Sequence, residues 1–212
     1  MWDVFEISVN LFQVTIIIQT ITNYLGSRYT DLKGKILGAL AVAILFIELN
    51  YINEKVNFEG LAIIVPIFIT FIYAVIALRG SWKKKLYCSV LIMIFIIGIT
   101  TVVMNFMGIL FDRTYVDLIE EKNNIRIISL VIIQVLIFYI TRIFLHKRSE
   151  DVGELSWDMW IITIIIPIVS IMILAFVLEI SINTIDEFRD SGIKMAILVS
   201  MGIFVTNISN YS

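Results

Sequence analysis

The sequence predicts an all-α fold, a polytopic bundle of about seven membrane-spanning helices. Of the 212 residues, 59% are hydrophobic and only 16% are charged. The mean hydropathy of +0.96 exceeds what a soluble core of this size uses. Seven stretches approach the roughly 20 apolar residues with which a helix crosses about 30 Å of hydrocarbon. The runs VLIMIFIIGITTVVM and IIPIVSIMILAFVL are apolar on every side, whereas strands of a membrane β-barrel alternate apolar and polar residues.

Each predicted span lies between polar or charged segments. In chain order the spans are residues 4–25, 36–52, 60–78, 86–111, 127–145, 159–180 and 193–211. The last is the weakest, because no charge follows Lys194 up to Ser212 to anchor its end, and a bundle of six helices stays open. Because no internal repeat or low-complexity linker interrupts the chain, residues 1–212 are predicted to form one transmembrane domain.

The basic residues are unevenly divided between alternate loops. Ten of the 16 Lys and Arg residues lie in RYTDLKGK, RGSWKKK and TRIFLHKR, while six lie in the other loops, which carry most of the acids. Since cations near span ends favour the cytoplasmic side, the N-terminus is predicted outside and, with seven spans, the C-terminus in the cytoplasm. Trp82, Trp157 and Trp160 flank the predicted inner ends and Trp2 the outer face, at the headgroup level that indole rings prefer.

Polar residues interrupt the predicted spans, mostly in their outer halves. Glu6, Asn10, Gln13 and Thr20 follow one another at intervals of 4, 3 and 7 residues, so they align along one side of the first helix. Because buried polar groups avoid lipid, we predict that they turn inward and help to form an outward-opening ligand pocket. The predicted ligand-binding residues are Glu6, Asn10, Gln13, Glu48, Asn105 and Gln134.

A structural role for the same residues is the alternative. Polar side chains join membrane helices through hydrogen bonds of about 1 kcal/mol each, and Glu6 and Glu48 can lie near the headgroups. Asn50 falls in the same outer half. The acidic loops NEKVNFEG, DRTYVDLIEEKNNIR and SINTIDEFRDSG would form the rim of the pocket and suit a neutral or cationic ligand, or they only keep the loops soluble.

Both prolines of the chain, Pro66 and Pro167, fall inside predicted spans. Proline removes a helix hydrogen bond and tends to kink the helix, so both are candidate hinges. Static packing is the alternative, because proline is common in membrane helices.

The residues needed for catalysis or metal binding are missing from the sequence, which predicts no enzyme activity, cofactor or metal site. His146 has no Cys or His companion nearby, and the single cysteine, Cys88, precedes it by 58 residues. The stretch EEKNNIR lacks the histidines that would hold a nucleophilic water. Neither a phosphate-binding glycine loop nor a basic aromatic surface for nucleic acid is present.

Four features of the chain together resemble a known class of receptor. They are the start MWDVFEISVNLFQ, the short cationic loop after it, the RGSWKKK turn and a fifth span that ends IFYITRIFL. In these the chain resembles the N-terminal sensor region of clostridial receptor histidine kinases, of the peptide-pheromone type found in accessory-gene-regulator quorum sensing. The kinase half of those receptors belongs to the GHKL ATPase superfamily.

The resemblance implies a multi-pass protein of the bacterial cell membrane that detects an extracellular peptide and works as a homodimer in a two-component system. The phosphorylated histidine and the ATP-binding lobe would follow the last span, so the kinase domain is absent from residues 1–212. His146 lies between spans five and six and is not the phosphoacceptor in this correspondence. The chain is then expected to be the sensor domain of a longer protein or a truncated product.

Two other functions remain open from the sequence. One is a small membrane subunit of a transporter, although the first span lacks the seam of small residues expected of such subunits. The other is a structural or immunity membrane protein without a ligand.

Overall fold

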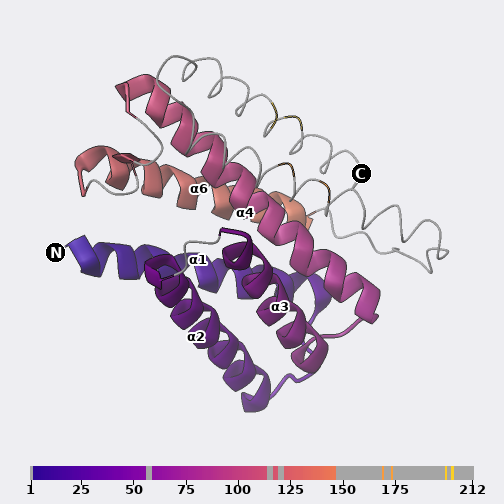
Figure 1. Cartoon of the computed structure of the whole chain (residues 1–212). Coiled ribbons are helices and arrows are strands. Elements are labelled where there is room, and N and C mark those ends of the chain that lie inside the picture. The colour runs from indigo at the N-terminus through magenta and orange to yellow at the C-terminus, as the bar shows by residue number, and fades with distance from the viewer. Residues whose placement is uncertain are drawn as a thin grey trace. The chain divides into compact units, whose positions relative to one another are not determined.

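The computed structural model describes residues 2–55, 59–113, 117–118 and 122–146, together with Val169, Ile173, Val199 and Gly202. Within these residues the chain forms five helices and one isolated β-bridge, and no strand (Figure 1). The helices are α1 (Trp2–Leu25), α2 (Leu32–Lys55), α3 (Glu59–Ala77), α4 (Trp82–Phe111) and α6 (Asn124–His146).

Three of the described segments are long and apolar enough to cross a membrane. They are Trp2–Leu25, Trp82–Phe111 and Asn124–Arg142, and Ile64–Ala77 is a shorter apolar helix. Helices cover the predicted spans 4–25, 36–52, 86–111 and 127–145, and all of 60–78 except Leu78, which forms the β-bridge. Of these five predicted spans, 36–52 and 60–78 are not among the three described segments that are long and apolar enough to cross a membrane. Apart from Val169, Ile173, Val199 and Gly202, the predicted spans 159–180 and 193–211 lie outside the described residues. The number of seven spans and the orientation stay predictions.

Two helices begin about one turn before the predicted spans. Helix α2 starts at Leu32 and α4 at Trp82, so the lysines of both loops are helical, whereas Arg28 and Arg79 precede the helices. Each start follows a residue suited to the N-cap, Asp31 or Ser81. The Ser81 hydroxyl accepts a weak hydrogen bond of 3.4 Å from the backbone N–H of Lys84. Hydropathy reports depth in a membrane, whereas the cap decides where the helix begins.

Left-handed residues end two of the helices. Gly26 (φ 77°) follows α1 and donates its N–H to the carbonyl oxygen of Thr22, at 2.9 Å. Asp112 (φ 51°) follows α4, and the next N–H, of Arg113, bonds the Gly108 oxygen at 2.9 Å. These are an αL cap and a Schellman-type cap, and both satisfy carbonyl groups that the last turn would otherwise leave without donors.

The chain divides into two compact units. Unit 1 comprises Met1–Met93 and Phe138–Trp160, and unit 2 comprises Ile94–Ile137 and Ile161–Ser212. Helices α1, α2 and α3 belong wholly to unit 1, whereas α4 and α6 continue from one unit into the other.

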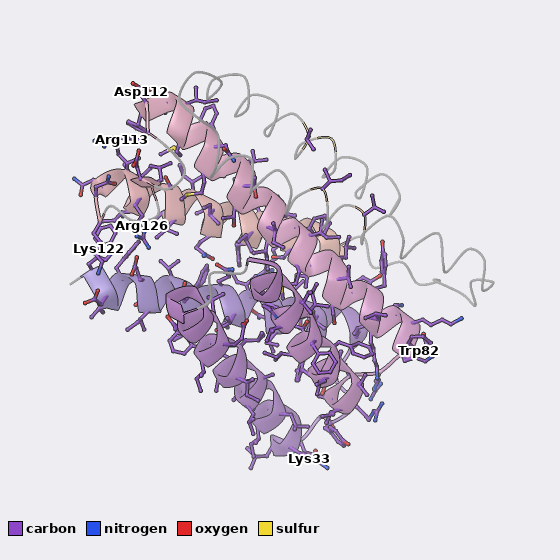
Figure 2. All side chains as sticks on the ribbon, viewed as in Figure 1. Lys33, Trp82, Asp112, Arg113, Lys122 and Arg126 are labelled. Carbon is purple, nitrogen blue, oxygen red and sulfur yellow. The ribbon has the colours of Figure 1, made fainter. Side chains whose placement is uncertain are left out.

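Two cationic loops of unit 1 are joined by backbone hydrogen bonds. The bridge pairs Ser27 with Leu78. Arg28 donates its N–H to the Ala77 oxygen at 2.8 Å, and Arg79 donates to the Gly26 oxygen at 2.9 Å. We call this pair of bonds the loop clamp. It fixes the end of α1 beside the end of α3, and Figure 2 labels Lys33 and Trp82 near the helix starts that follow the two loops.

Helix α2 packs against both α1 and α3 (Figure 1). A Cβ atom placed on Gly38 of α2 would lie 3.6 Å from the Tyr73 hydroxyl of α3. The Tyr73 hydroxyl also lies 2.8 Å from Thr22 Oγ1 of α1. Because the Thr22 hydroxyl donates its one hydrogen to the Ile18 oxygen at 2.6 Å, Tyr73 is the donor to Thr22. A side chain at Gly38 would thus be in ordinary van der Waals contact with the tyrosine that ties α3 to α1.

Helix α4 is the most enclosed of the apolar helices. In its most apolar stretch 72% of the residues are buried, compared with 33% in α1 and 28% in α6. Every residue from Cys88 to Ile96 is buried. Helix α4 is therefore surrounded by protein, whereas α1 and α6 retain broad apolar faces suited to lipid.

The Lys85 side chain supports the junction of α3 and α4. Lys85 is only 3% exposed, and its ammonium group lies 3.4 Å from the Val75 carbonyl oxygen in the last turn of α3. A cation at that place satisfies a terminal carbonyl and matches the negative end of the helix dipole.

We expect Gly34→Ala to destabilise unit 1, because a Cβ atom at this position would collide with the Tyr29 carbonyl oxygen of the α1–α2 loop. Forcing an atom into a packed site costs about 1–3 kcal/mol. The measurement is the thermal unfolding midpoint in detergent, followed by the reaction of buried Cys88 with a fluorogenic maleimide. At about 2–4 °C per kcal/mol, a fall of several degrees is expected.

Gly98→Ala is the matched control, because no atom lies within 4 Å of a Cβ placed there. This variant should unfold at the wild-type temperature or above it, since alanine favours a helix over glycine by about 1 kcal/mol. Equal midpoints for Gly34→Ala and wild type would contradict the collision.

Candidate functional site

The polar stripe of α1 meets α2 at one hydrogen bond. The Asn10 amide nitrogen donates to the Asn50 amide oxygen at 3.0 Å, between residues 40 positions apart. The Asn50 nitrogen in turn donates to the Phe46 carbonyl oxygen, one turn back on α2, at 2.7 Å. Both side chains are partly buried. The two amides form a short directional chain from α1 through Asn50 to the backbone of α2.

The other predicted residues of the α1 stripe lie beside Asn10 on the same helix. Glu6 is four residues before it and Gln13 three residues after it, so both project from the same side of α1. Both are half-buried, as is Asn10, while Thr20 further along is buried. The part of the stripe from Glu6 to Gln13 is therefore a half-buried polar side of α1, which the buried Ile16 and Ile17 separate from Thr20.

Glu48 does not share a side of α2 with Asn50. Two residues apart on a helix means about 200° of rotation, so the two side chains point to different sides. Glu48 is half-buried, and one of its oxygens, Oε2, is buried without a hydrogen-bond partner among the described residues. Asn50, outside the predicted ligand set, is the α2 residue that contacts Asn10.

Asn105 and Gln134 belong to unit 2. They are 2% and 6% exposed, respectively. The Asn105 nitrogen donates to the Thr101 carbonyl oxygen of its own helix at 2.8 Å, while its Oδ1 and the Thr101 hydroxyl are buried without hydrogen-bond partners among the described residues. The four residues of unit 1 and these two thus fall in separate units, and their convergence on one pocket stays a prediction.

Of the two candidate hinges, the structure describes only Pro66. Pro66 lies inside α3, which continues from Glu59 to Ala77. The Thr70 hydroxyl lies 2.8 Å from the Pro66 oxygen and 2.9 Å from the Ile67 oxygen, and such back-bonding to the preceding turn often bends a helix. Pro167 lies outside the described residues.

A cavity in unit 1 lies away from the predicted ligand residues. It measures about 280 Å³ and is found toward the loop-clamp end of α1 rather than at Glu6, Asn10 and Gln13. Its lining residues are Ile16, Gln19, Thr20, Asn23, Phe138, Thr141 and Arg142. Only Thr20 was part of the predicted stripe. The signal in the sequence is the pair Gln19 and Asn23, one helical turn apart, together with Arg142 inside the apolar run IFYITRIFL.

The end of unit 2 where α4 stops and α6 starts carries mixed charges. Figure 2 labels Asp112, Arg113, Lys122 and Arg126 there. Asn123 caps α6, since its side-chain oxygen accepts the backbone N–H of Arg126 at 2.9 Å. Within the described ranges no group of His, Cys, Asp and Glu side chains is arranged to hold a metal ion.

We expect the Asn10 and Asn50 side chains to be energetically coupled. In a double-mutant cycle of Asn10→Leu and Asn50→Leu, the coupling should be about 0.6 kcal/mol and at most about 1.7 kcal/mol, the range found for hydrogen bonds between membrane helices. Unfolding in mixed detergent and dodecyl sulfate, followed by circular dichroism, measures it.

Ser8→Ala is the control for that cycle. Ser8 is exposed on the same helix and bonds only its own turn, at the Val4 oxygen (2.7 Å). Its coupling with Asn50→Leu should be near zero. If the coupling energy of Asn10 with Asn50 were no larger than that of Ser8 with Asn50, the amide pair would add nothing to the stability of the contact between α1 and α2.

Three comparisons with known proteins bear on identity. Searches against protein-family models, curated proteins and solved structures find no match to this chain.

Proposed function

We propose that the chain is the membrane sensor region of a receptor histidine kinase, which detects an extracellular peptide and relays the signal to a cytoplasmic kinase module beyond residue 212. The resemblance of MWDVFEISVNLFQ, RGSWKKK and IFYITRIFL to sensor regions of this kind supports the class of protein. The observation that carries the ligand site is the hydrogen bond between the Asn10 and Asn50 side chains.

An amide pair between helices is a suitable place for a peptide to act. A peptide backbone offers the same N–H donors and C=O acceptors as the asparagine side chains. If the hydrogen bond between Asn10 and Asn50 breaks and each amide then bonds the peptide backbone, both amides remain hydrogen-bonded. The exchange therefore costs little free energy. In this proposal the ligand inserts between α1 and α2 and takes over the bond from Asn10 to Asn50.

The loop clamp determines which part of α1 can move when the ligand inserts. At that end α1 is held beside α3 by the backbone bonds of Arg28 and Arg79 and by the contact of Thr22 with Tyr73. The half of α1 that carries Asn10 is held to α2 by side chains. Separation of α1 from α2 at Asn10 would thus turn α1 about the clamp, and that motion is the proposed signal.

The energy required is modest. A ligand shifts an equilibrium only by the difference in its affinity for two arrangements, and couplings of about 1–3 kcal/mol are typical. The bond between Asn10 and Asn50 belongs to the same range of energies. A ligand that gains one or two hydrogen bonds in the separated arrangement is enough to change the populations.

The stripe should affect signalling more than insertion. We expect Glu6→Ala and Gln13→Leu, in a fusion of residues 1–212 to a histidine kinase core, to raise the half-maximal peptide concentration about tenfold. One lost hydrogen bond to a charged or amide group justifies that size. The measurement is autophosphorylation in membrane vesicles titrated with the peptide fraction of spent medium from the source bacterium.

Thr15→Val serves as the control, because Thr15 is exposed on α1 and its hydroxyl bonds the Leu11 oxygen of its own helix at 2.7 Å. Its dose response should equal that of wild type. If Glu6→Ala and Gln13→Leu also kept the wild-type response, the stripe would have only a structural role.

The orientation is open to a separate test. With Cys88 replaced by Ala, we expect Lys122→Cys to react with a membrane-impermeant maleimide in intact cells and Lys33→Cys to react only after lysis, because the basic loops favour the cytoplasm. Both lysines are exposed, so access through the protein does not limit the reaction. The reverse labelling pattern would place the stripe on the cytoplasmic side and rule out an extracellular ligand.

A further inference from the structure

The cavity of unit 1 combines a small size with a polar wall. Its volume of about 280 Å³ lies just below the range of about 300–1,000 Å³ typical of pockets for drug-sized molecules. That space suits a small ion or a single headgroup rather than a peptide. The cavity is therefore a different kind of site from the Asn10–Asn50 contact.

Hydrogen-bond donors dominate the polar part of the wall. Gln19 and Asn23 of α1 carry amide N–H₂ groups, and Arg142 of α6 carries a guanidinium. Thr20 is only 4% exposed and adds a hydroxyl group. The Thr141 hydroxyl, also buried, is turned to the Phe138 carbonyl oxygen at 3.0 Å. Four donor-bearing side chains thus line one small space.

The charge of the wall is positive. Among the described residues that line the cavity, none is acidic. Arg142 lies with its guanidinium carbon 5.1 Å from the centre of the Phe138 ring, a cation–π contact that steadies the group beside the cavity. A wall of donors around an arginine favours an oxyanion.

The position of the cavity along the membrane normal indicates which anion it binds. Asn23 is two residues before the end of α1, and Arg142 is four residues before the end of α6 at His146. Both therefore lie at the boundary between hydrocarbon and headgroups. The anions concentrated at that level are the phosphates of lipid headgroups.

We propose that this cavity binds a phosphate group, with Arg142 as the charged ligand and Gln19, Thr20 and Asn23 as hydrogen-bond donors. A headgroup of an anionic phospholipid and free phosphate both offer this chemistry. The site holds α6 to α1 through the shared anion. The inference needs only insertion in a membrane and does not depend on the proposed receptor function.

Native mass spectrometry of the purified full chain in detergent tests the proposal. The protein is titrated in three arms, with short-chain phosphatidylglycerol, with inorganic phosphate and with a diacylglycerol of the same chain length. Wild type should bind phosphatidylglycerol and not diacylglycerol, and Arg142→Gln should weaken that binding about tenfold. Binding in the lipid arm alone identifies a headgroup, whereas binding in the phosphate arm that also depends on Arg142 identifies free phosphate.

The matched control is Arg79→Gln, since Arg79 is exposed and contributes only its backbone N–H to the loop clamp. Its affinity should equal that of wild type, because its side chain does not line the cavity. Gln19→Leu, at an exposed position, should weaken binding about threefold and decides the matter if Arg142→Gln does not fold. Wild-type affinity in both cavity variants, or an equal loss in Arg79→Gln, would overturn the proposal.

Discussion

Satisfaction of the backbone polar groups is the constraint on which the rest of this structure depends. A chain this apolar can enter hydrocarbon only if its N–H and C=O groups bond one another, which restricts each crossing segment to a helix. Hydrogen-bond partners are then missing only at the helix ends, where the first four N–H and the last four C=O groups have none within the helix. Here local devices meet it, among them the left-handed Gly26 and Asp112 and the Asn123 cap. The loop clamp does the same for two loops at once.

The polar side chains divide between two uses. Several hydroxyl and amide groups bond the carbonyl oxygen one turn back on their own helix, as in Thr15, Ser89 and Asn105. Such a bond removes a polar group from lipid without joining anything. Others reach a neighbour, as Asn10 reaches Asn50 and Tyr73 reaches Thr22. The contact of Thr22 lies beside the loop clamp, where backbone bonds accompany it, whereas the contact of Asn10 lies in the N-terminal half of α1.

That difference gives unit 1 a stable end and an adjustable end. At the clamp, backbone bonds, a buried Lys85 on the α3 terminus and the Tyr73 hydroxyl act together. Toward the N-terminus, the half-buried residues Glu6 and Gln13 flank the amide pair of Asn10 and Asn50. A ligand acts most easily where the contacts are side-chain bonds that it can exchange for its own. The proposed peptide site and the proposed phosphate site occupy these two ends of α1, the first adjustable and the second fixed.

The sequence by itself determined the helical class, the position of five helices to within a few residues and the polar side of α1, because hydropathy and the 3.6-residue period are local properties of the chain. Helix starts were missed at Leu32 and Trp82, since lysines that lower hydropathy are good helix formers. Only the tertiary structure decided that Asn10 pairs with Asn50, that Glu48 points elsewhere and that Gln19, Asn23 and Arg142 line one cavity. Those relations depend on how neighbouring helices are rotated and offset, which side-chain packing between the helices decides and no periodicity encodes.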